Sequence, residues 1–219
     1  MKVIGVGLNK TGTKTLRAHL MDWGFRHRSY ELDAFKQFRR GQIEELLDSM
    51  AQHDSFEDWP WPLMYQEIDR RFPDARFVLT TRKTADHWYH SLCKMAVRMG
   101  PLNDFEIHIY GHAMPHGKRS HHIDFYEQHN QQVRDYFRDR PGKLLQVCWE
   151  DGGTPQQLAE FLNLQNVNIE PQHRNPGLPV YSGDNLAMAH LSRVAFQSKW
   201  KLIRGAKKIA RMVRGKSNR

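Results

Sequence analysis

The sequence predicts an α/β fold in which a parallel sheet carries helices on both faces. The chain opens with a short apolar and β-branched run, "VIGVG", which is typical of a buried strand. Segments with strand character then alternate with segments whose apolar residues recur at helical spacing. With 219 residues and 39% hydrophobic content, the chain suits one such domain, or one domain and a tail.

The first half of the chain alternates between strand and helix. Residues 2–7 form the apolar first strand, and residues 13–23 follow as a helix that Gly24 ends. Leu16, Leu20 and Trp23 recur at the spacing of one helical face. A possible short strand follows at residues 25–30, and then a helix at residues 35–50 with a break near Gly41. A second short strand lies at residues 54–57, and a helix that follows two prolines lies at residues 63–72.

The second half continues the alternation. The run "RFVLTT" at residues 76–81 is the clearest strand after the first, and Thr84 then caps a helix that extends to about Arg98. Residues 100–121 are rich in His, Gly and Pro, which predicts a long loop of the kind that serves as a lid or binding loop. A helix, a strand and a last helix complete the domain at residues 123–138, 143–148 and 155–162.

Charge separates the chain into two parts. No acidic residue follows Asp184, and ten of the 33 Lys and Arg residues lie between Arg193 and Arg219. The remaining 23 nearly balance the 24 Asp and Glu residues, so the net charge of +9 belongs to the tail. We therefore expect an α/β domain over residues 1–183, a basic helical tail over residues 184–219, and no nucleic-acid partner for the body.

The cysteine content and the apolar runs indicate the compartment. Cys93 and Cys148 are the only cysteines, which excludes a disulfide framework. The N-terminal apolar run is too short for a signal peptide, and no apolar stretch approaches the roughly 20 residues of a membrane span. We expect a cytoplasmic protein, with attachment to a membrane surface through the tail left open.

Residues 7–15, "GLNKTGTKT", predict an anion-binding loop between the first strand and its helix. The loop misses the kinase-type P-loop, because Thr13 stands at the lysine position, and it misses the dinucleotide fingerprint, because Lys10 replaces the third glycine. Even so, a strand–helix loop of a parallel sheet lies at the ligand-binding edge, where helix N–H groups favour an anion. Hydroxyls, charges and a glycine add to this site: Thr11, Thr13, Thr15, Lys10, Lys14 and Gly12.

A second element decides which anion fits. The pairing of "KTGTKTL" with the later "TTRKTADHWYHS" resembles the sulfotransferases that use 3′-phosphoadenosine 5′-phosphosulfate (PAPS), and the resemblance extends over residues 1–178. It implies a three-layer fold like that of the P-loop NTPases, in which helices flank a parallel sheet on both faces. It also implies that Arg82 and Ser91 bind the 3′-phosphate and that Arg174 belongs to a basic closing loop. The 5′-phosphosulfate would contact Lys10, Thr11, Gly12, Thr13, Lys14 and Thr15.

The sequence departs from the family pattern at three places. Asn9 stands where proline is usual, and Lys14 stands where a small hydroxyl residue is usual. Arg82 and Ser91 are nine residues apart, whereas eight is commoner. Because Thr84 lies seven residues before Ser91, as the usual cap does in the family, the extra residue precedes the helix and Ser91 keeps its helical face.

Sulfuryl transfer needs a positive charge that stabilises the bridging oxygen of the leaving phosphate, and a base that takes the proton of the acceptor. Lys10 is the candidate for the first role, which is the family's use of this lysine. Asp58 is the candidate base, since it follows a strand and its neighbours in "WPWP" would exclude water and raise its pKa, although a turn or cap role is the competing interpretation. Histidine is the alternative base, with candidates His53, His87, His112, His116, His121, His122 and His129. We expect no metal, because no set of ligands stands at metal-binding spacing.

Two other functions remain open at this point: an ATP-dependent small-molecule kinase with an aberrant loop, and a nucleotide-binding protein without catalysis. The absence of an aspartate at the end of the "RFVLTT" strand argues against the kinase. For a sulfotransferase we expect a hydroxyl or amine acceptor on a small molecule, lipid or carbohydrate, and the sequence does not identify it. The amphipathic tail predicts contact with an anionic membrane or an acidic polymer, or else a helix docked on the body.

Overall fold

The structure is a computed structural model, and it describes residues 1–99, 104–170, 180–199 and 201. The chain divides into two compact units. The first comprises Met1–Trp88 and Ile123–Gly177, and the second comprises Tyr89–His122 and Leu178–Arg219. The predicted boundary between residues 183 and 184 stays a prediction, because these units follow spatial contacts and not a single cut in the chain.

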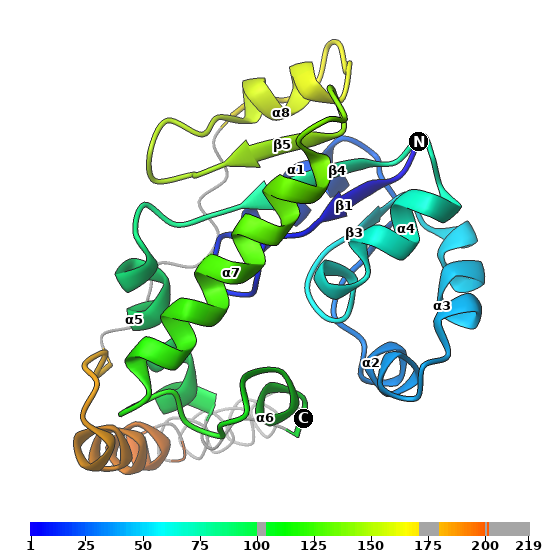
Figure 1. Ribbon diagram of the computed structural model, residues 1–219. Helices are drawn as coiled ribbons and strands as arrows, with labels where there is room; N and C mark the ends of the chain where they lie inside the picture. The colour runs from blue at the N-terminus through cyan, green and yellow to red at the C-terminus, as the bar shows by residue number, and fades with distance from the viewer. Residues whose placement is uncertain (100–103, 171–179, 200, 202–219) are drawn as a thin grey trace, which may run out of the picture. The chain divides into compact units, whose positions relative to one another are not determined.

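Within the described residues, five strands form one parallel sheet in the order β2-β3-β1-β4-β5. The strands are β1 (Val3–Gly5), β2 (His27–Arg28), β3 (Ser55–Phe56), β4 (Arg76–Thr80) and β5 (Leu144–Val147). In the register, Val3 of β1 lies beside Ser55 on one side and Arg76 on the other. The predicted parallel sheet is therefore confirmed, with β1 at its centre (Figure 1).

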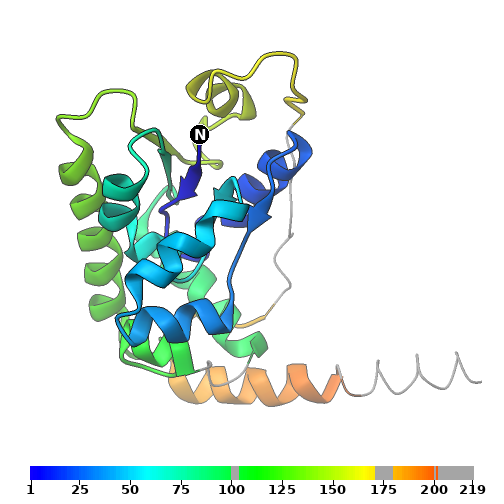
Figure 2. The ribbon, with the colours of Figure 1, turned by 90° about the vertical axis from the view of Figure 1, so that its right-hand side faces the viewer.

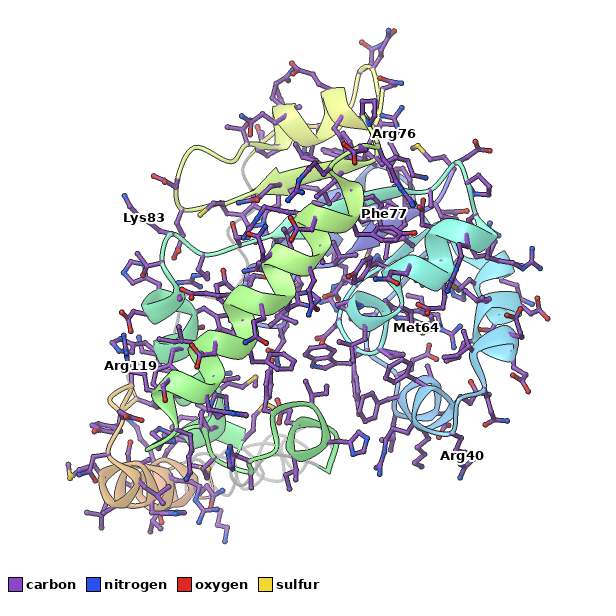
Figure 3. All side chains as sticks on the ribbon, in the orientation of Figure 1. Arg40, Met64, Arg76, Phe77, Lys83 and Arg119 are labelled. Carbon is purple, nitrogen blue, oxygen red and sulfur yellow. The ribbon has the colours of Figure 1, made fainter. Side chains whose placement is uncertain are left out.

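Alternating side chains of the central strands build two apolar cores. Ile4, Phe77 and Leu79 face the core formed with helices α2 (Leu32–Arg39), α3 (Ile43–Ser49), α4 (Tyr65–Arg71) and α7 (Arg119–Phe137). Val3 and Val78 face the opposite core, formed with α1 (Thr13–Asp22) and α8 (Pro155–Phe161). Figure 1 shows α7 lying across the sheet, and Figure 3 marks Phe77 beside it. The three-layer arrangement follows from the period of two along each strand.

Local sequence signals correctly mark the ends of two helices and the start of a third. Gly24 follows α1 with a φ of 85°, which glycine adopts without a steric cost. The break near Gly41 separates α2 from α3. The hydroxyl of Thr84 accepts a hydrogen bond from the His87 N–H at 3.1 Å, so Thr84 caps α5 (Ala85–Met99) as expected.

The expected loop over residues 100–121 is wrong in part. Asp104–Tyr110 forms helix α6, and α7 begins at Arg119, before the predicted start at residue 123. A seven-residue helix is too short to be stable alone, so packing decides its formation, and the side chain of Tyr110 is buried. Composition rich in glycine and histidine could not reveal this packing.

A further helix covers residues 186–199, inside the segment predicted as a basic helical tail. The part of that tail beyond residue 201 lies outside the described residues. Within the described ranges, we find no helix with the length and apolar character that crossing a membrane requires.

We predict that Gly7→Ala destabilises the protein. A Cβ atom at Gly7 would lie 2.1 Å from the Thr80 hydroxyl oxygen and 2.3 Å from the Thr80 carbonyl oxygen, so β1 and β4 would have to separate. Overpacking of this kind costs about 1–3 kcal/mol or more, which lowers the melting temperature by about 2–4 °C per kcal/mol in a chain of this size. Gly41→Asn is the control, because its site has open space and a φ of 72° that asparagine tolerates. Equal melting temperatures for the two variants would contradict the prediction.

Candidate functional site

The site lies at the carboxyl edge of the sheet in the first unit. β3, β1 and β4 are parallel neighbours, so the residues that follow them emerge at one edge. Lys10 follows β1, Asp58 follows β3 and Arg82 follows β4. Three separate segments thus bring a lysine, an aspartate and an arginine to the edge where ligands bind in parallel sheets.

The β1–α1 loop is held tightly against β4. Gly7 passes Thr80 without room for a side chain, and the buried Thr11 hydroxyl donates to the Leu8 carbonyl oxygen at 2.6 Å and contacts the Thr80 hydroxyl at 2.6 Å. Lys10 and Gly12 have φ angles of 70° and 96°. A fixed loop of this kind keeps its N–H groups in place before a ligand binds.

The N-terminus of α1 carries the features of an anion site. Gly12 is its N-cap residue and makes no side-chain cap hydrogen bond, and the first turn holds no acidic residue. Lys10 and Thr15 are half-buried, while Lys14 is exposed. Positive charges at a helix start without a capping side chain favour a bound anion.

Two of the three predicted threonine donors already have partners within the protein. The Thr11 hydroxyl is occupied as described above, and the buried Thr13 hydroxyl hydrogen-bonds the Glu57 carboxylate. Their contribution to the loop is therefore its shape. Contact of their hydroxyls with a phosphosulfate stays a prediction.

Arg82 is bound on three sides. Its Nη1 donates to the Lys10 carbonyl oxygen at 3.3 Å, its Nη2 lies 2.5 Å from Glu150 Oε1, and its backbone N–H donates to the Tyr126 hydroxyl at 3.0 Å. The guanidinium thus lies against the β1–α1 loop. Its half-buried position and its charge suit an anion. A bound anion would compete with Glu150 for the guanidinium.

Glu150 was not among the residues predicted from the sequence. Its signal was present, since Glu150 follows β5 in "VCWED" and β5 neighbours β4, whose end carries Arg82. Strand order decides which acidic residue meets Arg82, and the sequence did not establish that order. Trp149, also missed, lies against the loop, and a Cβ atom at Gly12 would lie 2.4 Å from its ring.

Asp58 has an environment suited to a base. It is half-buried, follows β3, and adopts a φ of 64°, which aspartate tolerates better than most residues. Burial and the neighbouring Glu57 charge raise its pKa to about 7, while the Trp59 N–H and the charges of Lys14 and Lys10 act in the opposite direction. The charges of Lys10 and Lys14 in the β1–α1 loop therefore act on this carboxyl group.

Glu57 differs from its neighbour although both carboxyl groups lie together. Burial acts to raise its pKa, but hydrogen bonds from His27, Ser29 and Thr13 prevail and lower it. Glu57 Oε1 accepts from the Ser29 hydroxyl and lies 3.6 Å from His27 Nε2. Glu57 stays ionised, and its charge is one cause of the raised pKa of Asp58.

The other predicted residues lie as follows. Ser91 is half-buried on α5, in the second unit, and Arg174 lies outside the described residues. Of the candidate histidines, His129 is buried with Nε2 2.8 Å from the Val6 carbonyl oxygen, a structural position. His53 and His87 belong to the first unit, and the remaining four to the second: His112, His116, His121 and His122. In the described part of the chain, no three His, Cys, Asp or Glu side chains are grouped as a metal site.

Comparison with known protein families gives one match, which includes the segments of this site. Residues 2–107 match the model of the sulfotransferase domain family. The match covers the β1–α1 loop, Asp58, Arg82 and Ser91, and it confirms the predicted resemblance over this part of the chain. A search of curated proteins returned no match. Sulfuryl transfer is therefore supported as the general activity.

We predict opposite effects on nucleotide binding for Arg82→Ala and Glu150→Gln. Arg82→Ala should lower the affinity for 3′-phosphoadenosine 5′-phosphate relative to AMP. The expected loss is the free energy of a charged hydrogen bond, about 1.5–3 kcal/mol. In Glu150→Gln the guanidinium loses its competitor, so the same ratio should rise about 2- to 5-fold, the range of a partly exposed ion pair.

Isothermal titration would measure both ratios. Asp151→Asn is the matched control, because it removes the same charge one residue away, where Asp151 pairs with Lys83 at 3.4 Å. A weaker affinity in Glu150→Gln would show that Glu150 positions Arg82 instead of competing for it.

Proposed function

With a sulfotransferase domain matched over residues 2–107, we propose that this protein transfers a sulfuryl group from PAPS to a hydroxyl or amine of an acceptor. The observation that carries the proposal is that the β1–α1 loop and Asp58, a carboxyl group with a raised pKa, follow neighbouring parallel strands at the same edge of the sheet. Lys10 and Lys14 act electrostatically on Asp58, although the chain places them on different segments. A phosphate site next to a candidate base is what transfer to a protonated acceptor requires.

The residues fit a nucleotide with phosphate at both its 3′ and 5′ positions. The start of α1 and the two loop lysines would hold the 5′ side, and Arg82 the 3′ side. PAPS, when bound, supplies the sulfuryl group on its 5′-phosphate. Lys10 would place a positive charge at the oxygen where negative charge develops.

Asp58 completes the chemistry by taking the proton of the acceptor. A base works best when its pKa lies near the operating pH, and about 7 meets this condition, whereas an ordinary aspartate is a much weaker base. The cores on both sides of the sheet fix the strands that carry these residues, so the geometry is set before the acceptor arrives.

A ligand-binding assay tests the proposal directly. At about 100 times its dissociation constant, a ligand stabilises a protein by roughly 2.7 kcal/mol, which corresponds to a rise in melting temperature of about 5–10 °C here. We expect that rise with 3′-phosphoadenosine 5′-phosphate, and a smaller one with AMP or with ATP and Mg²⁺. A larger shift with ATP and Mg²⁺ would instead favour a kinase. Turnover with labelled PAPS across a panel of acceptors then tests transfer itself.

The pH profile of turnover separates the roles of Asp58 and Lys10. A base acts in its deprotonated form, so kcat/KM of the wild type should rise with pH through about 7. Asp58→Asn should remove this rise and lower kcat by about 10²–10⁴-fold. Lys10→Ala should lower kcat by about 10²-fold or more but keep the rise, moved to higher pH because the Lys10 charge lowers the pKa of Asp58.

Titration calorimetry with 3′-phosphoadenosine 5′-phosphate would verify that Asp58→Asn still binds nucleotide. If that variant kept wild-type turnover, the base would be one of the histidines and not Asp58.

A further inference from the structure

The helix over residues 186–199, which belongs to the second unit, has one covered face. Ala189 is buried, and Ser192, Arg193 and Phe196 are half-buried. At about 100° per residue these four positions fall on one side of the helix. Figure 2 shows the helix as one continuous orange ribbon. The covered face fixes which residues lie on the opposite side.

The opposite face is apolar and exposed. Met188, Leu191 and Val194 have exposed fractions of 49%, 64% and 58%. Together with small neighbours on the same side they form a row that we term the apolar stripe: Ala187, Met188, Leu191, Val194, Ala195 and Ser198. None of its members is charged. A helix packed on a protein by one face normally carries charged and polar residues on the other, so this pattern is inverted.

The sequence that follows the apolar stripe is basic. Lys199 and Lys201, directly after it, are both exposed. The sequence holds no acidic residue after Asp184, and ten Lys and Arg residues lie between Arg193 and Arg219. An apolar face beside dense positive charge has the composition of a helix that lies in the interface of an anionic membrane.

We propose that the apolar stripe docks on an anionic lipid surface, with its apolar side chains entering the interface and the exposed Lys199 and Lys201 contacting the headgroups. An acidic polymer would need only the charges, and it would leave the row of Met188, Leu191 and Val194 without a role. A second copy of the chain would bring two segments of like charge together, which opposes self-association. Charge and apolar area together fit lipid.

The experiment is flotation of the full chain with vesicles of phosphatidylcholine, with or without phosphatidylglycerol. The test variant is Leu191→Ser with Val194→Ser, which removes apolar area without changing the net charge. The matched control is His190→Ser with Gln197→Ser, two exposed positions of the same helix outside the apolar stripe. Circular dichroism would confirm equal helix content, and Leu191→Gln with Val194→Gln would replace the test variant if it unfolded.

We expect the wild type and the control to bind vesicles that contain phosphatidylglycerol, and to bind pure phosphatidylcholine weakly. The test variant should lose about 10- to 100-fold in partitioning, the loss expected for a few apolar groups withdrawn from the interface. Turnover of a small water-soluble acceptor should be equal in all three proteins, so failure here differs from failure of the proposed function.

Other occupants would give other results, and each would overturn the proposal. Equal vesicle binding by the wild type and the test variant would show that charge alone acts. A dimer of the wild type in sedimentation that the test variant abolishes would assign the apolar stripe to a second copy. Binding to an acidic polymer but not to the anionic vesicles would show that the basic residues after the apolar stripe recognise a polymer and not lipid.

Discussion

The close approach of Gly7 to Thr80 is the constraint on which the site depends. Because no side chain fits between them, β1 can lead its loop directly over the end of β4, and Thr11 then bonds to the Thr80 hydroxyl. Arg82, two residues beyond Thr80, reaches the Lys10 carbonyl oxygen as a result. One tight backbone contact therefore sets the relative position of the two cationic elements that the resemblance assigns to opposite ends of a nucleotide.

Electrostatics within the site follow from two adjacent carboxyl groups in different surroundings. Glu57 is satisfied by hydrogen bonds and remains charged, whereas Asp58 has its carboxyl group buried beside that charge. Two titratable groups whose environments separate their pKa values can take different roles, one structural and one reactive. The Thr13 hydroxyl takes part, because its hydrogen bond to Glu57 links the start of α1 to the segment that carries Asp58.

The sequence predicted the sheet well because buried parallel strands and their helices leave local patterns. Apolar runs such as "VIGVG" and "RFVLTT", and stops such as Gly24, mark elements without knowledge of their neighbours. The short helix α6 was missed because its formation depends on the burial of Tyr110. Glu150 was missed because its partner, Arg82, is set by strand order. Pairings between distant segments were thus the part that local patterns could not supply.

The two cationic regions of the chain should respond differently to salt, and this difference follows from their burial. Lys10 and Arg82 are half-buried, and the Arg82 guanidinium donates to the Lys10 carbonyl oxygen, so the attraction of both charges to an anion is only weakly screened. Lys199 and Lys201, which follow the apolar stripe, are exposed, and bulk ions screen such charges over about 8–10 Å. A rise in ionic strength would therefore weaken the proposed attachment to lipid more than the proposed binding of a nucleotide. The apolar stripe matters for this reason, because apolar contact with lipid does not depend on ionic strength as charge does. On the proposed lipid surface, the apolar stripe would retain the protein under salt conditions in which the exposed lysines alone would release it.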